Sequence, residues 1–373
     1  MFIVERIVSL FAFAGTLFIA CYLISHCSMK QVRTVLFAYL IMLMVFAFNY
    51  KPYRTADLYR LREYIQYWVD LPLESLFSYL LNSASPAWVA YAYLVSKLGN
   101  VNWLQTGSCL VSFGLSFYFI RTTIEKNAVM GTNRGLLLFS YMAIGAIFLQ
   151  AISDIRHIMG FTIIAFSLYR ELKGKSFWIH IPLYLLAALF HPTAIVLVAA
   201  RFLSVGFSKK GWRSKIAATI LTVPVVLFCY RQGSQYFLST VAKANSYLTG
   251  DEYTYIWEII IGIAEAVQTI MILRHYQKHY TANEKERYLW LFAMVLQVGS
   301  ILALPFSYAV FRRYTLFCTM ITIPFFGKTL CAEDSEQRNM KLYREWMYLL
   351  SAAIFILSFV RGDICGYKFF VLQ

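Results

Sequence analysis

Three ionisable side chains stand close together in the stretch SDIRHIMGF, residues 153–161: Asp154, Arg156 and His157. A guanidinium can bind an anion and an imidazole can move a proton. The surrounding run is apolar for a helix length on both sides, too long for one membrane-spanning helix and too short for two full ones. Arg134 and Arg170 flank it, so the positive-inside rule places both ends in the cytoplasm. The three groups are therefore predicted at an outer apex.

Two later turns repeat this arrangement. The apolar run 177–208 has FHPT near its middle, where Pro192 interrupts helical hydrogen bonding. His191 then lies at a second outer apex or at a kink in one long helix. A third outer turn, PFSYAVFRRYTLF, carries Arg312 and Arg313 at the start of a span.

Ionisable groups at membrane depth are costly and are usually paired or functional. Asp154 could simply neutralise Arg156, and His191 could satisfy a carbonyl at a helix end. Taken together, three outer apices that each present Arg or His favour a site for an anion, because guanidinium donors match phosphate oxygens. The pattern leaves open which of Arg312 and Arg313 faces that site.

The composition requires a membrane fold. Of 373 residues, 60% are hydrophobic and only 14% charged, and apolar runs recur from end to end. The prediction is an all-α polytopic protein, a single transmembrane domain over 1–373 with about twelve spans. Several spans are short, which favours helices that end around an outward-facing cavity. The predicted spans are 7–25, 32–49, 103–120, 135–152, 156–170, 177–190, 192–206, 216–231, 255–273, 289–306, 312–330 and 346–361.

Alternate loops between these spans hold 20 of the 34 Lys and Arg residues, which places those loops in the cytoplasm. Residues 50–102 then form a large extracytoplasmic loop. Its helix at PAWVAYAYLVSKLG is too short to span and is predicted to lie in the outer interface or to re-enter, with Trp88, Tyr91 and Tyr93 at headgroup depth. Residues 232–254 form a second extracytoplasmic loop. The first apolar segment is interpreted as a retained span and not as a cleaved signal peptide.

Other chemistries find little support in the sequence. The net charge is +15, but the basic residues form no stripe on a soluble face, so nucleic acid is not an expected partner. Seven cysteines form no CxxC pair, and no metal site or cofactor is expected. His275 and His279 could be a metal pair but fit a solvated loop better. Glu258 and Glu265 share a helix face and could serve a proton or cation path, although a structural role is favoured.

The central stretch resembles the EpsG family, which comprises Wzy-like bacterial polysaccharide polymerases. The resemblance rests on Arg156-His157 and Gly160, followed by a basic loop and an A-x-x-x-H-x-T-A pattern. The latter is formed by Ala187, His191, Thr193 and Ala194. RTADLYRLREY, VFRRYTLF and the C-terminal GYKFF resemble further family elements. His157 replaces the usual Gln, and Gly366 stands where proline is common.

The resemblance implies a reaction on undecaprenyl-pyrophosphate-linked oligosaccharides at the outer face of the bacterial plasma membrane. A growing glycan would leave its pyrophosphate lipid and join a sugar hydroxyl of the next repeat unit, without a metal. A GT-C-like membrane fold is expected, with a chain-length regulator and a flippase as candidate partners. The products would be O-antigen, capsule or exopolysaccharide.

Within this reaction we assign roles as hypotheses. His191 is the base or positions the acceptor, and Asp57 is a second base candidate. Arg156, with Arg312 or Arg313, stabilises the pyrophosphate leaving group, and Asp154 orients Arg156 or His157. Sugars could stack on aromatic side chains of the two outer loops. The substrate-binding set on the first loop comprises Tyr59, Arg60, Tyr64 and Trp68. A single displacement would invert the anomeric centre.

Rival functions remain. A flippase for the same lipid-linked sugars would have inverted repeats and helices broken near the midplane, which the sequence does not show. A membrane acyltransferase that modifies surface glycans would also use an intramembrane histidine, with its acyl donor entering from the cytoplasm. A scaffold would need no outward arginine cluster.

Overall fold

A computed structural model describes residues 2–52, 57–143, 146–208, 252–280, 283–305, 307–331 and 337–365, together with residues 212 and 216. All regular structure within this part of the chain is helical. The helices are α1 (Phe2–His26), α2 (Val32–Asn49), α3 (Asp57–Gln66), α4 (Leu73–Asn82), α5 (Pro86–Ser96), α6 (Trp103–Asn127), α7 (Thr132–Ala143), α8 (Ala146–Ser153), α9 (Ile155–Leu172), α10 (Phe177–Phe190), α11 (Pro192–Ser208), α13 (Glu252–His279), α14 (Glu284–Ala303), α15 (Tyr308–Thr329) and α16 (Gln337–Cys365).

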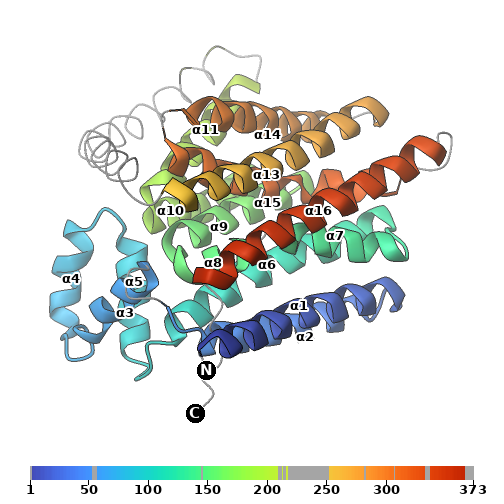
Figure 1. Ribbon diagram of the computed structural model, residues 1–373. Helices are drawn as coiled ribbons and strands as arrows, with labels where there is room; N and C mark the ends of the chain where they lie inside the picture. The colour runs from blue at the N-terminus through green and yellow to red at the C-terminus, as the bar shows by residue number, and fades with distance from the viewer. Residues whose placement is uncertain are drawn as a thin grey trace.

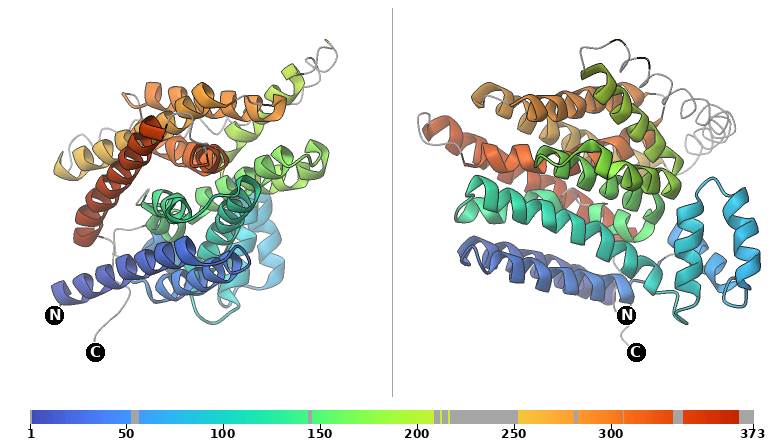
Figure 2. Two further views of the ribbon diagram at one scale, coloured as in Figure 1. Left: turned by 90° about the vertical axis from the view of Figure 1, so that its right-hand side faces the viewer. Right: turned by 180° about the vertical axis from the view of Figure 1, so that it is seen from behind.

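The long helices run side by side as one bundle, and the short helices α3, α4 and α5 form a cap at one of its ends (Figures 1 and 2). By length and composition, three described helical stretches could cross a membrane: Ile7–His26, Val32–Asn49 and Ile259–His279. Phe177–Phe190 is a shorter apolar helix. The all-helical membrane fold is confirmed at this level, and the count of twelve spans stays a prediction.

Helices occupy eleven of the twelve predicted spans, and the remaining one, 216–231, lies almost wholly outside the described residues. Helices α7 and α8 occupy the predicted span 135–152 on either side of residues 144–145, which lie outside the described residues.

The loop predicted over 50–102 contains the three helices of the cap. Its expected interfacial helix exists as α5, but the Trp88 and Tyr93 side chains are buried. The Tyr91 hydroxyl donates a hydrogen bond to the Leu104 carbonyl at 2.5 Å, which ties α5 to α6. Exposed apolar side chains of the cap include Phe77 and Leu81 on α4 and Leu94 on α5. The predicted loop over 232–254 lies outside the described residues except for the first turn of α13.

Helix α9 lies at the centre of the bundle and packs against α6, α10, α11 and α15. Its side chains are buried over most of its length, so its apolar residues face other helices on all sides. Two prolines lie in the helix pair that follows α9. Pro182 is inside α10, and Pro192 begins α11, where its missing N–H is not needed. The chain thus brings the two predicted apices to the same end of one helix cluster.

Candidate functional site

The first apex is the junction of α8 and α9. Asp154 occupies the position before α9, with non-helical backbone angles (φ −91°, ψ 42°). One turn later, the His157 side chain is only 4% exposed. Its Nε2 lies 3.9 Å from Asp154 Oδ2, so the carboxylate and the imidazole form a pair at the start of the helix.

The second apex is His191, which lies in extended conformation (φ −157°, ψ 137°) between α10 and α11. It is a break between two helices and not a kink in one, because Pro192 starts a new helix. The His191 ring is 5% exposed. Its Nδ1 lies 2.7 Å from Thr193 Oγ1 and accepts a hydrogen bond from the Thr193 backbone N–H at 3.2 Å.

These contacts define the tautomer of His191. A backbone N–H can only donate, so Nδ1 must act as the acceptor and carries no proton. The neutral ring then carries its proton on Nε2. The hydrogen-bond geometry therefore assigns Nε2 as a hydrogen-bond donor, which favours a positioning or electrophilic role for this ring over that of a general base.

The two histidines meet. The ring centroids of His157 and His191 are 5.8 Å apart, with the rings inclined at 64°. Small residues of the central motif make this approach possible. A Cβ added at Gly160 would lie 3.0 Å from the Ala187 carbonyl oxygen and 3.4 Å from the Ala194 Cβ. The spaced Gly and Ala residues are thus the contact between α9 and the α10–α11 turn.

The third apex separates the two neighbouring arginines. Arg312 forms an ion pair with Glu265 of α13, and both side chains are buried. Arg313 is half-buried, and its guanidinium lies within electrostatic range of Asp154, His157 and His191. The position of Tyr314 agrees with this placement, because its hydroxyl donates to the Thr193 carbonyl at 3.4 Å. Of the two arginines, Arg313 is the better placed to bind a ligand beside the histidines.

Arg156 joins the same cluster from α9. Its guanidinium lies over the Trp88 ring at 5.9 Å from the centroid and within electrostatic range of His191 and Asp154. Trp88 is therefore a wall of the site. Among the described residues, neither Arg156 nor Arg313 has an ion-pair partner within 4.0 Å.

The predicted site residues on α3 lie near this cluster, but two of them are exposed and paired with each other. Asp57 forms an ion pair with Arg60, and the two side chains are 54% and 66% exposed. Asp57 also lies within electrostatic range of Asp154, which places α3 at the edge of the cluster. Tyr59 is half-buried, Tyr64 is exposed, and Trp68 is buried within the cap.

One feature of the site has no signature in residue type. The N-termini of α9 and α11, which begin at Ile155 and Pro192, both lie beside the histidine pair. A helix N-terminus carries a partial positive charge and free backbone donors, and it attracts anions. Two such termini and two arginines, Arg156 and Arg313, lie around the histidine pair.

The model of the EpsG family matches residues 62–370 of the chain, the greater part of its length. The chain belongs to the EpsG family. Family members are Wzy-like polysaccharide polymerases, so the protein is, at that level of description, a membrane enzyme of glycosyl transfer. The matched range includes both apices and the paired arginines, whereas Asp57, Tyr59 and Arg60 precede it. No curated protein and no solved structure matches the chain.

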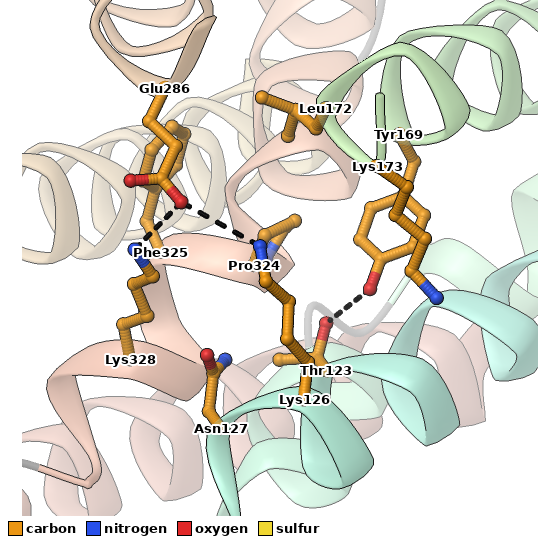
Figure 3. Close-up of a pocket in the computed structure, with 10 residues that line it drawn as sticks. All are labelled: Thr123, Lys126, Asn127, Tyr169, Leu172, Lys173, Glu286, Pro324, Phe325 and Lys328. Atoms are coloured by element: carbon orange, nitrogen blue, oxygen red, sulfur yellow. Dashed lines mark hydrogen bonds and ion pairs between the residues drawn. The ribbon is translucent and has the colours of Figure 1, made fainter. Parts of the chain in front are cut away.

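The opposite end of this EpsG-family bundle has a small pocket between α6, α9, α14 and α15 (Figure 3). Lys126 and Lys328 point toward Glu286 there, at 3.8 Å and 2.7 Å from its Oε1. The Tyr276 hydroxyl donates to the other carboxylate oxygen at 3.0 Å. The cavity is about 20 Å³, enough for a water molecule but not for a sugar. None of the predicted site residues lines it.

Proposed function

We propose that this protein transfers a growing glycan from undecaprenyl pyrophosphate to a sugar hydroxyl of the next lipid-linked repeat unit, at the outer face of the plasma membrane. The observation that carries the proposal is the meeting of Arg156, Arg313, His157 and His191 beside the N-termini of α9 and α11. This cationic cluster lies at the bundle end whose loops hold fewer Lys and Arg residues, the end predicted to be outside.

The proposed reaction is a single displacement. The acceptor hydroxyl oxygen forms a bond to the anomeric carbon while the bond from that carbon to the pyrophosphate oxygen breaks. The lipid pyrophosphate leaves with the bonding electrons, and the hydroxyl proton passes to a carboxylate. Attack opposite the leaving group inverts the anomeric centre. No metal is required in this proposal, because fixed cations stabilise the developing charge.

Individual roles follow from the geometry. Arg156 and Arg313 approach from different helices, which suits two phosphate groups of one diphosphate. His191 donates from Nε2 to a phosphate oxygen or to the acceptor sugar. Asp154 and Asp57 are the two candidate bases. Asp154 is the less exposed of the two and lies beside His157. Asp57 would have to break its ion pair with Arg60 before it could accept a proton.

The test is chain growth from purified lipid-linked repeat units in proteoliposomes, measured as a ladder of product lengths on a gel. A polymerase gives a ladder with the wild-type protein and none with Arg313→Gln. A flippase would move a fluorescent lipid-linked unit across the bilayer without any ladder, and an acyltransferase would incorporate labelled acyl groups instead. Either of the latter results, with no ladder, would refute the proposal.

A further inference from the structure

The ion pair between Glu265 and Arg312 lies near the start of α15, and Arg312 directly precedes Arg313 in the chain. The Glu265 side chain is fully buried, and the Arg312 side chain is 9% exposed. A buried carboxylate and guanidinium are expensive to desolvate, and replacing such a pair with apolar residues often costs nothing. A contribution to folding stability therefore does not explain why this ion pair is present.

From this arrangement we infer that Glu265 is a positioning residue, which holds Arg312 so that Arg313 is presented to the pyrophosphate. The inference rests on the proposed function of the site. In an α-helix, adjacent residues point about 100° apart. Locking the Arg312 side chain toward α13 thus fixes the rotation of α15 and directs Arg313 toward a different side, where His157 and His191 lie within electrostatic range. Asp154 lies within electrostatic range of both arginines.

A second contact at the same level supports a fixed register between α13 and α15. A Cβ added at Gly262, one turn before Glu265, would lie 2.6 Å from Cε1 of Phe311. The Phe311 ring, fully buried, therefore occupies a space that only glycine leaves open. The two helices are locked by shape at Phe311 and by charge at Arg312.

Further along the same interface, the hydroxyls of Thr269 and Thr319 lie 3.4 Å apart. Polar contacts of this kind join helices in membranes at modest energy. Along α13 the contacts at 262, 265 and 269 meet 311, 312 and 319 in order, so the two helices run in the same direction with one register. Glu265 is the charged member of this series and lies nearest to the site.

This division of labour explains why two arginines stand side by side. Arg312 satisfies a buried carboxylate and is needed only while Glu265 is charged. Arg313 faces the site and is needed for the ligand. Removal of one partner of the buried pair leaves an uncompensated charge, which must move toward water and turn α15. A displacement of about 1 Å at a catalytic group can cost about 100-fold in rate.

The test compares four variants: Glu265→Leu, Arg312→Met, the double variant with both changes, and Glu265→Leu combined with Arg313→Met. Two quantities are measured on the folded fraction isolated by gel filtration. They are the binding of undecaprenyl pyrophosphate and the rate of chain growth. We expect each single change to weaken binding by roughly tenfold and to slow growth by about 100-fold. The Glu265–Arg312 double variant should return to within roughly threefold of wild type.

The matched control, Glu265→Leu with Arg313→Met, should show no recovery. A role in folding alone would lower the yield of folded protein but leave its binding affinity unchanged, which would overturn the inference. A Glu265–Arg312 double variant that folds yet binds as weakly as either single variant would also overturn it, because Arg312 would then be a direct ligand. Binding of the probe without any chain growth by the wild type would count against the proposed function and not against the positioning role.

Discussion

Charged groups are arranged differently at the two ends of the bundle. At the end predicted to be cytoplasmic, Glu286 has Lys328 and Tyr276 as partners. Nearby, Glu171 accepts hydrogen bonds from both Tyr184 and Arg201. Each of these two carboxylates therefore has at least two donor side chains. These contacts join neighbouring helices, and we assign them no role in the proposed reaction.

At the end that carries the two histidines, the charges are less evenly matched. Among the described residues, Asp154 lies within electrostatic range of both Arg156 and Arg313 and is also close to His157, whereas Asp57 at the edge of the cluster is paired with Arg60. Half-buried positive charge without matching negative charge is unfavourable in a membrane protein unless a ligand supplies the anion. We therefore infer that a charged residue in this fold is structural when its charge is paired within the protein, and functional when it is not.

The sharpest way to break this comparison is to remove one cation from each end. Arg313→Gln should slow chain growth by roughly 100- to 1,000-fold, because a donor aimed at developing charge is lost. Lys175→Gln, an exposed cation at the opposite end, should leave the rate unchanged. Growth rates in proteoliposomes at equal protein density provide the measurement. Equal losses in both variants would show that the cluster acts only through general charge.

The role of His191 can be sharpened with two amide replacements. The glutamine side-chain amide reaches the position of Nε2, whereas that of asparagine reaches the position of Nδ1. If donation from Nε2 matters, His191→Gln should retain activity about tenfold above His191→Asn, since a single hydrogen bond to a charged group is lost in the latter. Product ladders give the rates. Complete inactivity of both variants at normal folded yield would restore the assignment of a general base.

The paired end should respond in stability and not in activity. Glu171→Gln removes the charge that Arg201 and Tyr184 share in the interior. Breaking a buried pair costs on the order of 3 kcal/mol. The thermal midpoint in detergent should therefore fall, while the growth rate per folded molecule stays near that of the wild type. A normal midpoint with a slow enzyme would mean that this network communicates with the site.

Much of this arrangement is predictable from sequence. Hydropathy located the helices, and the distribution of Lys and Arg placed the predicted apices at one common end of them, because both depend on local composition. His157 and His191 could be placed at the same end for that reason. Their mutual distance of 5.8 Å could not, since it depends on how closely α9 and α10 pack.

The other features of the site could not be predicted, because they depend on contacts between segments that are far apart in the sequence. The sequence could not distinguish Arg312 from Arg313, because the residue that pairs with Arg312, Glu265, lies on another helix. Glu265 was expected to be structural, and its partner was not foreseen. Trp88 was expected at headgroup depth, yet it is buried beneath the guanidinium of Arg156. Aromatic residues look alike in sequence whether lipid or a cation covers them.

The smallest expected effect comes from a matched pair of glycines, one at each end. An added methyl at Gly327 would lie 2.0 Å from Thr123 Cγ2, and one at Gly160 would lie 3.0 Å from the Ala187 carbonyl oxygen. Overpacking of this kind costs about 1 to 3 kcal/mol, so Gly327→Ala should lower the thermal midpoint more than Gly160→Ala. Only Gly160→Ala should also slow chain growth, by roughly fivefold, because it pushes His157 away from His191. Midpoints and growth rates measured on the same preparations separate the two effects. If Gly327→Ala slowed growth as much as Gly160→Ala, the two ends would be mechanically coupled, and the distinction between a structural and a functional end would fail.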